Sequence, residues 1–569
     1  MRIARIFLAI ATLAILTWAQ VRPRDIGYPL PVHGRHGIVA SSNVIATSVG
    51  LDILKRGGNA VDAAVAVALA LAVTHPSAGN LGGGGFMLVR MADGRGEAID
   101  YREMAPGKAS HDMYLGPDGK LAPRLSTVGY LASGVPGTVS GLSLALTRFG
   151  KMRWADVIEP ARKLAQEGFP VSYSLASSLR SSHAAGAFPE GRRIFQRDGN
   201  FYQEGEVLKQ PELAATLKRL QSGGPREFYE GRTAHLIAAD MRAHGGLITL
   251  DDLKNYRAVS RQPLKGTYRG YELLSMPPPS SGGVALFEML NILEQYPMAS
   301  LGFDSARKDH VLIEAMRRAF ADRAEFLGDT DFVRVPVSGL ISKSYAAGLA
   351  KSIDPDRATP SSVIGHGEPM RDEPPQTTHF TVVDADGNAV ANTYTLNGGF
   401  GSGVVVEGAG FFLNNEMDDF AAKPGVPNMF GLIQGEANSV APRKRPLSAM
   451  TPTLVLQNGK LVLALGSPGG PTIINTVLQV ILNVFDYHMN IQQAVNAPRL
   501  HHQWMPDTIG FEPFGISDDT RMALEKMGHQ FAARAGYMGD AEAVMIDQET
   551  GMRWGASDPR NPDSAAMGY

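Results

Sequence analysis

The spacing of apolar residues predicts a mainly helical middle section of the chain. Between residues 137 and 352 most segments repeat their apolar positions with the period of a helix, and Gly and Pro interrupt them. The clearest examples are residues 154–166, 211–221, 234–243 and 306–326.

After residue 377 the pattern changes to short runs typical of strands. Residues 377–383 and 389–395 flank an Asp-Ala-Asp-Gly-Asn turn and predict a β-hairpin. A second hairpin is expected around Asn458-Gly459, followed by helices over 472–485 and 491–496. The Asp-rich turn lacks the distal Glu of a calcium loop, so we interpret it as a turn.

The N-terminal part predicts two helices and another hairpin. Residues 38–75 are expected to form two helices in series, with Ser42 as the first N-cap and Gly57-Gly58 as its end. Residues 60–73 are nearly all Ala, Val and Leu, which favours a fully buried helix too short to span a membrane. Residues 86–102 indicate a hairpin. Strands framed by helices before and after predict an α/β (α+β) fold with four αββα layers.

Composition narrows the possible functions. The formal net charge of −2 gives no sign of nucleic-acid binding, and the chain contains no Cys, which excludes disulfides and a thiol nucleophile. Two arginines, a short apolar stretch and Thr17-Trp18-Ala19 are typical of a signal peptide over residues 1–19. We therefore expect a periplasmic or secreted protein without a stable membrane span. An uncleaved N-terminal anchor is the alternative.

The junction at Thr377 suggests self-cleavage. Residues 354–376 are rich in Pro, Gly, Ser and charge and have no hydrophobic period, so a disordered segment is expected to lead into the strand that opens with Thr377. Cleavage after Gln376 would give Thr377 a free α-amine beside its hydroxyl, which together form a nucleophile and its base. This arrangement predicts an N-terminal-nucleophile (Ntn) hydrolase.

Several other motifs have plain structural interpretations. The run of glycines at residues 82–85 lacks the Lys-Ser/Thr of a phosphate-binding loop and indicates close backbone approach. His501 and His502 are adjacent and therefore do not share one face, so a structural role is expected instead of metal binding. Residues 466–470, Gly-Ser-Pro-Gly-Gly, lie between a strand and a helix. They are compatible either with a tight turn or with an anion site built from backbone N–H groups.

Two charged features suggest a zwitterionic ligand. Residues 414–420 concentrate acids and amides that could receive an ammonium group, although a solvated turn is the usual interpretation. Arg102 could bind a carboxylate with its guanidinium fork, or form a surface salt bridge.

Together these segments resemble the γ-glutamyltransferase (γ-glutamyl transpeptidase) family over roughly residues 34–569. Nine motifs occur in the family's order, among them Thr-Thr-His-Phe and Asn-Asn-Glu-Met-Asp-Asp-Phe. They cover residues 57–64, 79–86, 101–106, 134–139, 377–380, 414–420, 445–448, 466–470 and 496–499. The resemblance implies an Ntn-hydrolase sandwich made from one self-cleaved precursor. A large subunit (20–376) and a small catalytic subunit (377–569) would form a heterodimer.

The resemblance also implies a role for each catalytic residue. Thr377 would first attack the carbonyl of Gln376 and later the γ-glutamyl amide of glutathione or a related compound. Thr395 would orient the nucleophile, and the N–H groups of Gly469 and Gly470 would form the oxyanion hole. Water, an amino acid or a peptide would accept the γ-glutamyl group. No metal or organic cofactor is implied.

The substrate-binding residues follow in the same way from the resemblance. Arg102 and Ser448 would bind the α-carboxylate. The α-ammonium would be bound by Asn397, Glu416 and Asp419.

The chain departs from the common bacterial pattern near these residues. Ala449 follows Ser448 where many members have a second serine, and Phe430 stands where several have a Tyr above the site. Gly398-Gly399 replaces bulkier polar residues. These changes put substrate preference in question. A glutaryl-cephalosporin acylase-like Ntn amidase and an exported binding protein that never matures are the alternatives. The presence of Asn397, Glu416 and Asp419 argues against the amidase, because a glutaryl group has no α-ammonium. The presence of Thr377, Thr395 and Gly469-Gly470 argues against the binding protein.

Overall fold

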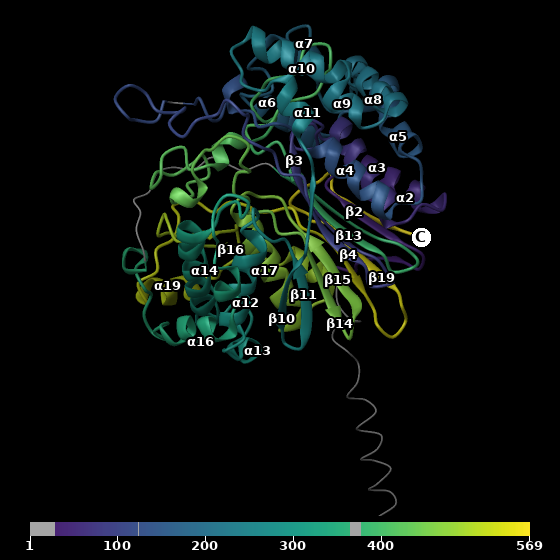
Figure 1. The fold of residues 1–569 in the computed structure, drawn as a ribbon. Coiled ribbons are helices and arrows are strands. Elements are labelled where there is room, and N and C mark those ends of the chain that lie inside the picture. Colours follow the sequence, from purple (N-terminus) through teal and green to yellow (C-terminus); the bar gives the residue numbers. More distant parts are fainter. Residues whose placement is uncertain (1–28, 123, 365–376) are drawn as a thin grey trace, which may run out of the picture.

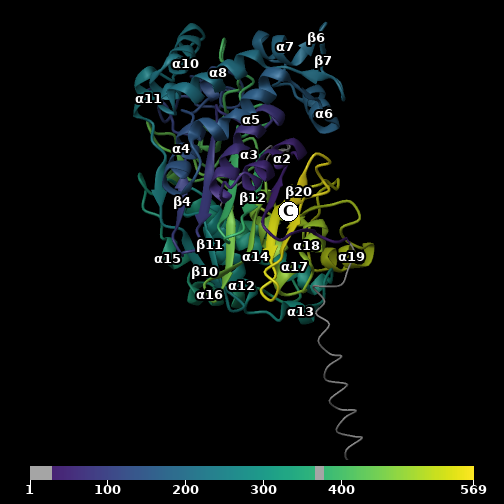
Figure 2. The same ribbon diagram turned by 90° about the vertical axis from the view of Figure 1, so that its right-hand side faces the viewer.

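The architecture consists of two stacked β-sheets with helices on both outer faces. In the computed structural model, which describes residues 29–122, 124–364 and 377–569, two seven-stranded sheets pack against each other. Figures 1 and 2 show the sheets in the middle of the molecule with helices above and below them. The predicted four-layer αββα fold is confirmed.

The first sheet contains the strand that follows Thr377. Its order is β20-β2-β12-β13-β3-β4-β9, so β12 and β13 lie at its centre. All neighbouring strands in it are antiparallel. The strands are β20 (Ala565–Gly568), β2 (Ile38–Ser41), β12 (Thr378–Val383), β13 (Ala389–Thr395), β3 (Gly84–Arg90), β4 (Gly96–Asp100) and β9 (Val259–Arg261).

The second sheet is built in the same way. Its order is β1-β19-β18-β15-β14-β11-β10. The strands are β1 (Val32–Gly34), β19 (Arg553–Ala556), β18 (Glu542–Ile546), β15 (Lys460–Gly466), β14 (Thr453–Gln457), β11 (Tyr271–Ser275) and β10 (Leu264–Tyr268). Each of the two sheets therefore combines strands from before and after Thr377.

Helices cover the outer face of each sheet. The first sheet packs against α2 (Val44–Lys55), α3 (Ala60–Thr74) and α4 (Thr138–Phe149). The second packs against α12 (Gly282–Leu293) and α17 (Thr472–Phe485). Every residue of α3 is buried, as predicted. Among the described residues, no helix combines the length and apolar character needed to cross a membrane.

The remaining elements surround these layers. Helix α14 (Ala306–Phe326) packs on α12, and α5 (Trp154–Glu167) packs on α3 and α8 (Pro211–Gly223). The other helices are α6 (Tyr173–Ser181), α7 (Pro189–Phe195), α9 (Arg226–Glu230), α10 (Arg232–Ala243), α11 (Leu250–Asn255), α13 (Met298–Leu301), α15 (Val337–Leu340), α16 (Lys343–Lys351), α18 (Ile491–Asn496) and α19 (Asp518–Lys526). Three short pairs complete the sheets: β5 (Phe169–Pro170) with β8 (Val207–Leu208), β6 (Gln196–Arg197) with β7 (Asn200–Phe201), and β16 (Leu500–His501) with β17 (Gly510–Phe511).

The prediction of a helix from residue 38 is wrong at its start. Ile38–Ser41 is strand β2, and the helix begins only at Val44. Its N-cap is Asn43 rather than Ser42, because the Asn43 side chain accepts hydrogen bonds from the N–H groups of Ile45 and Ala46. A mainly apolar run of only four residues is too short to show either the period of a strand or that of a helix, so the sequence pattern could not distinguish the two. The three predicted hairpins and the helix over 306–326 are confirmed.

The polar segment before Thr377 is ordered in its first part. The prediction of disorder is wrong for residues 354–364, while residues 365–376 lie outside the described structure. The backbone N–H of Ser361 donates to Asp507 at 2.7 Å, and Arg317 donates to the Ser361 hydroxyl at 2.6 Å. Trp504 donates to the Ser361 carbonyl at 3.1 Å. Hydrogen bonds from α14 and the 504–507 loop thus hold this segment in place, and Ile364 also packs against the core.

The run of glycines at residues 82–85 allows the close backbone approach that the sequence predicted. A Cβ at Gly83 would lie 2.0 Å from the Thr395 carbonyl oxygen, and one at Gly82 would lie 2.1 Å from that of Phe412. A Cβ at Gly84 would lie 2.7 Å from a carboxylate oxygen of Glu103. The absence of side chains here lets β3 lie against the end of β13.

We expect Gly83→Ala to lower the stability of the protein. The added methyl meets the Thr395 carbonyl oxygen and the buried Asn80 side chain, and overpacking of this kind costs about 1–3 kcal/mol. Thermal unfolding of the variant should show a lower midpoint. Gly348→Ala in α16 is the matched control, because a Cβ there meets nothing within 4 Å and alanine favours a helix. Equal midpoints for Gly83→Ala and the wild type would contradict the prediction.

Candidate active site

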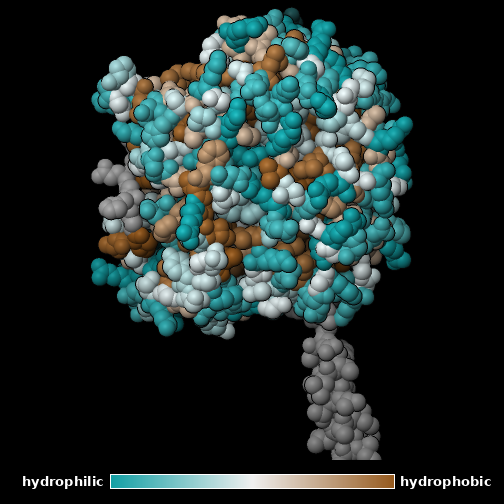
Figure 3. All heavy atoms as spheres, viewed as in Figure 1, coloured by the Kyte–Doolittle hydropathy of each residue, from teal (hydrophilic) through white to brown (hydrophobic). Residues whose placement is uncertain are grey.

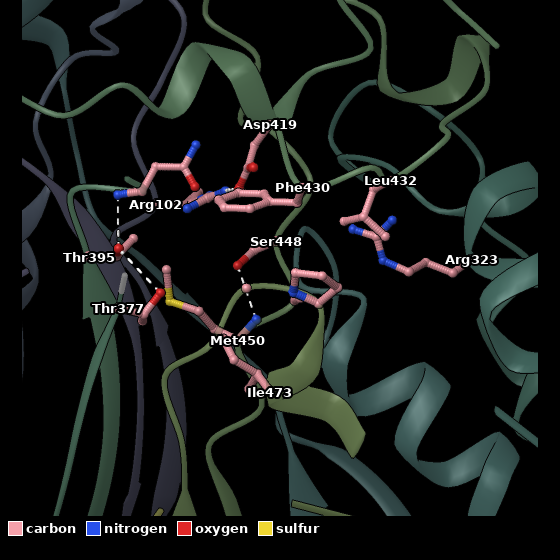
Figure 4. A pocket seen from close by; sticks show the side chains of 14 residues that line it. Arg102, Arg323, Thr377, Thr395, Asp419, Phe430, Leu432, Ser448, Met450 and Ile473 are labelled. Carbon is pink, nitrogen blue, oxygen red and sulfur yellow. Dashed lines mark hydrogen bonds and ion pairs between the residues drawn. The ribbon is translucent and has the colours of Figure 1, made fainter. Parts of the chain in front are cut away.

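Two threonine hydroxyls meet at the end of the central strand pair. Thr377 directly precedes β12, and Thr395 is the last residue of β13. Because Thr378 pairs with Tyr394 in the antiparallel register, the two ends lie side by side. The Thr395 hydroxyl donates to the Thr377 hydroxyl at 3.4 Å, and it accepts the N–H of Asn397 at 2.8 Å (Figure 4). Gln376 lies outside the described residues.

The glycine turn at residues 466–470 leads from β15 into α17. Gly469 and Gly470 have φ angles of 132° and 54°, which side chains rarely allow. The Gly469 carbonyl accepts both the N–H and the hydroxyl of Thr472. Within the described parts of the chain, neither glycine N–H donates to a protein acceptor. Gly470 lines the same pocket as Thr377, so its N–H is a donor available close to the Thr377 hydroxyl.

Arg102 lies at the centre of a buried ion cluster. It follows β4 and is fully buried, and its Nη1 lies 2.7 Å from Glu416 while its Nη2 donates to Asp419. Nε donates to the Pro446 carbonyl at 3.2 Å. The surface salt bridge considered from the sequence is therefore excluded. Burial alone lowers the pKa of Arg102, but the neighbouring acids outweigh it and raise the pKa above its usual range, so the guanidinium stays charged.

Burial disfavours the charged form of the neighbouring acids. It raises the pKa of Glu103 to about 8 and the pKa of Glu416 well above its ordinary value, against the opposing charge of Arg102. Glu103 lies 3.7 Å from Arg102 and is fully buried. Its two carboxylate oxygens have no hydrogen-bond partner among the described residues. The positive charge of Arg102 thus offsets part of the free-energy cost of burying these acids.

Asn397 and Ser448 are positioned by backbone contacts. Asn397 has a φ of 78°, and its side chain donates to the Asn415 carbonyl at 3.2 Å. The Ser448 N–H donates to the Pro279 carbonyl at 2.9 Å, and its hydroxyl accepts the Met450 N–H at 3.2 Å. Both residues thereby face the pocket that contains Thr377.

One small pocket gathers most of the predicted site. Of the nine predicted catalytic and substrate-binding residues, seven line it: Arg102, Thr377, Thr395, Asn397, Asp419, Ser448 and Gly470. Gly469 is next to it in the turn, and Glu416 lies behind it, against Arg102. The sequence did not identify Arg323, Leu432, Met450, Pro471 and Ile473, which complete the wall. Met450 and Pro471 are sequence neighbours of predicted residues, but no local signal marks Arg323 or Leu432.

The residues that depart from the family pattern lie at this pocket or beside it. Ala449 and Phe430 both line it together with Arg102 and Asp419 (Figure 4). Gly398 lies outside the lining, where an added Cβ would approach Asn415 at 3.2 Å. Their effect on substrate preference stays a prediction.

The histidines near these elements serve the packing of the protein. His379 packs between the sheets against Gly466, and burial lowers its pKa to about 3, so it is neutral. His501 contacts Asn475 at 2.7 Å, whereas His502 contacts Asp507 at 3.2 Å. The two adjacent side chains therefore have different partners, as expected for neighbours that do not share one face.

An αββα sandwich that presents a threonine at the head of a central strand defines the Ntn-hydrolase class. Comparison with known families gives a match to gamma-glutamyltranspeptidase over residues 46–568. The chain belongs to this family.

Individual relatives agree with this assignment. The glutathione hydrolase proenzyme of Escherichia coli is 51% identical over 95% of this chain and 93% of its own length. A cephalosporin acylase from Bacillus halodurans has a similar structure, with a TM-score of 0.81, 28% identity, and 95% of this chain and 98% of that chain covered. A chain of Helicobacter pylori gamma-glutamyltranspeptidase gives a TM-score of 0.56 with 44% identity, covering 57% of this chain and 93% of that one.

We expect Glu103→Gln to remove part of the pH dependence of stability. Burial raises the Glu103 pKa from 4.5 to about 8, so between these values the folded protein binds a proton that the unfolded chain does not. Below pH 4.5 this group therefore makes its whole contribution to the free energy of unfolding, and that contribution is lost as the pH rises toward 8. Glutamine cannot ionise, so the stability of the variant relative to wild type should increase from pH 5 to pH 8. Parallel denaturant curves at both pH values measure this, and a constant difference would contradict it.

Proposed function

We propose that this protein is a γ-glutamyltransferase and glutathione hydrolase that uses Thr377 as its nucleophile. The observation that carries the proposal is the pocket itself. It brings the paired hydroxyls of Thr377 and Thr395 together with a buried cation, Arg102, and a carboxylate, Asp419. Opposite charges side by side match the carboxylate and ammonium of an α-amino acid head group. A γ-carbonyl extending from that head group reaches the nucleophile.

The enzyme matures by self-cleavage between Gln376 and Thr377. Residues 20–376 form the large subunit and residues 377–569 the small catalytic subunit, which stay together as a heterodimer. Thr377 lies at the head of β12, as this scheme requires. Two comparisons support it, because the Escherichia coli relative is named a proenzyme and the solved Helicobacter pylori chain matches only 57% of this chain.

The reaction runs through a covalent ester. The free α-amine of Thr377 takes the hydroxyl proton while Oγ attacks the γ-carbonyl carbon. The N–H groups of Gly469 and Gly470 stabilise the negative oxygen that forms, and Thr395 holds the nucleophile in place. The amine leaves with a proton. Water then hydrolyses the γ-glutamyl ester, or an amino acid or peptide takes the group.

Substrate recognition divides between the two poles of the glutamyl head group. Arg102 and Ser448 bind the α-carboxylate, whereas Asn397 and Asp419 bind the α-ammonium. Glu416 contributes to the ammonium side through its charge and its contact with Arg102. Arg102 and Asp419 pair with each other, so binding of the head group would replace this ion pair with one at each of its two charges.

The protein acts outside the cytosol, in the periplasm or after secretion. The support is the N-terminal sequence, with its arginines, short apolar stretch and small residue at Ala19. Residues 1–28 lie outside the described structure. The mass of the large chain purified from cells tests this, because removal of residues 1–19 leaves Gln20 as its first residue.

A glutaryl amidase is the second candidate, favoured by the likeness to a cephalosporin acylase structure. A glutaryl group lacks the α-ammonium, so it would leave Asp419 without a new partner. We therefore expect γ-glutamyl-p-nitroanilide to be a better substrate than glutaryl-p-nitroanilide, by about 10-fold or more in kcat/KM for one charge-assisted hydrogen bond. The reverse order would favour the amidase.

We expect Thr377→Ala to give an uncleaved and inactive precursor, because the variant lacks the attacking hydroxyl. Intact-mass analysis should show one long chain, where wild type shows a chain that begins at Thr377. Thr378→Val is the matched control, since the Thr378 hydroxyl is buried and has no hydrogen-bond partner among the described residues. Normal processing of Thr377→Ala would overturn the mechanism.

A further inference from the structure

Arg323 is a pocket residue to which the reaction described above gives no role. It belongs to α14, it is only 2% exposed, and it lines the pocket together with Thr377 and Ser448. Figure 4 shows its side chain extending from the helix with the guanidinium directed to the pocket side. A buried arginine in such a place requires an explanation, because burying a charge without partners is costly.

Most of the donors of Arg323 are unused. Its Nε donates to the Ser281 hydroxyl at 2.9 Å. Nη1 is buried without a hydrogen-bond partner, and within the described ranges no carboxylate forms an ion pair with this guanidinium. Arg102 Nη1 also lacks a hydrogen-bond partner among the described residues, but Arg102 differs from Arg323 because its two terminal nitrogens form ion pairs with Glu416 and Asp419.

Other arginines of the same helix show what a purely structural role involves. Arg317 pairs with Glu314 at 3.2 Å and donates to the Ser361 hydroxyl at 2.6 Å. Arg318 pairs with Glu314 at 2.6 Å. Among the described residues Arg323 has no such acidic partner, so no carboxylate in direct contact neutralises its charge. Arg323 nevertheless lines the pocket that contains Thr377.

The position of Arg323 indicates which part of the substrate it meets. Its partner Ser281 donates through both its hydroxyl and its N–H to the Ser448 carbonyl, at 2.6 and 2.7 Å. Arg323 is thereby tied to the segment of Ser448 and Ala449, which is the carboxylate end of the proposed site. Ala449 has no hydroxyl to donate there.

We propose that Arg323 binds the α-carboxylate of the γ-glutamyl donor together with Ser448, as a substrate-binding residue that Arg102 alone cannot replace. The inference rests on the proposed function and adds a second cation to its carboxylate subsite. It explains the unused donors of a buried guanidinium and the absence of a second serine hydroxyl at Ala449. A bidentate contact with a carboxylate matches the geometry of the guanidinium fork.

Charge balance in the pocket supports this assignment. The guanidinium of Arg102 is in contact with the carboxyl groups of Glu416 and Asp419. An incoming carboxylate would therefore face a cation that is already paired, whereas Arg323 is not. Burial lowers the pKa of Arg323 to about 10, so it is still protonated near neutral pH and able to bind an anion.

The test compares substrates with and without the α-carboxylate. The mature enzyme and its Arg323→Gln variant are assayed with γ-glutamyl-p-nitroanilide and with 4-aminobutyryl-p-nitroanilide, which lacks only that carboxylate. We expect the variant to lose about 10- to 100-fold in kcat/KM on the first substrate, as for a lost charge-assisted hydrogen bond. On the second substrate it should match wild type. Arg323→Lys, which keeps the charge but not the fork, should lose less.

A binding measurement makes the result independent of turnover. Calorimetric titration of the mature protein with L-glutamate should show an affinity about 10- to 100-fold weaker in Arg323→Gln than in wild type. Arg307→Gln is the matched control, because Arg307 is exposed on the same helix. Adding Ala449→Ser to Arg323→Gln should restore part of the lost affinity.

The outcomes separate this inference from the proposed function. If wild type forms the chain beginning at Thr377 but does not cleave γ-glutamyl amides, the proposed function fails. If wild type is active and Arg323→Gln binds L-glutamate equally well, only the inference fails. Equal losses on both amides would also overturn it, because they would indicate a structural role. Intact-mass analysis confirms that each variant is processed before it is compared.

Discussion

The antiparallel pairing of β12 with β13 is the interaction on which the candidate site depends. It places the residue before one strand beside the last residue of the other, so that the Thr377 and Thr395 hydroxyls lie 3.4 Å apart. Strand β3 continues the same sheet, where Gly83 permits contact with the Thr395 carbonyl. Strand β4 then delivers Arg102 to the pocket. Neighbouring strands of one sheet thus carry both the proposed nucleophile and the arginine proposed to bind the substrate.

The pocket also depends on a balance of buried charges. Arg102 is surrounded by three acids, of which Glu103 and Glu416 are pushed by burial toward their neutral forms. A cluster of this kind contributes little net stability, but removing one member leaves an uncompensated charge, which typically costs about 3–5 kcal/mol. Because the ion pairs are already formed, the side chains are held in place before a substrate enters, and less ordering is required on binding.

Local patterns made much of this structure predictable, and tertiary contacts account for the rest. The hairpin of β12 and β13 follows from alternation and a turn sequence, and α14 from its period. Strand β20, Ala-Ala-Met-Gly, has no strand signal and exists because it pairs with β2. Family motifs identified the residues around Thr377, but not that Glu416 lies behind Arg102. Arg323 looks like an ordinary charged residue on a helix, and only the packing of α14 shows that it is buried at the pocket.

The composition of the two sheets has a consequence for the life of the mature enzyme. Strands from before and after Thr377 pair with each other in both sheets, as β12 does with β2 and β14 does with β11. Neither proposed subunit can therefore complete a sheet alone. The precursor folds as one molecule, but once the bond is cut, refolding requires two separate chains to find each other. Folding of the precursor can be reversible, but unfolding of the cleaved enzyme is not readily reversed. The lifetime of the mature enzyme is therefore set by its rate of unfolding and not by its free energy of unfolding.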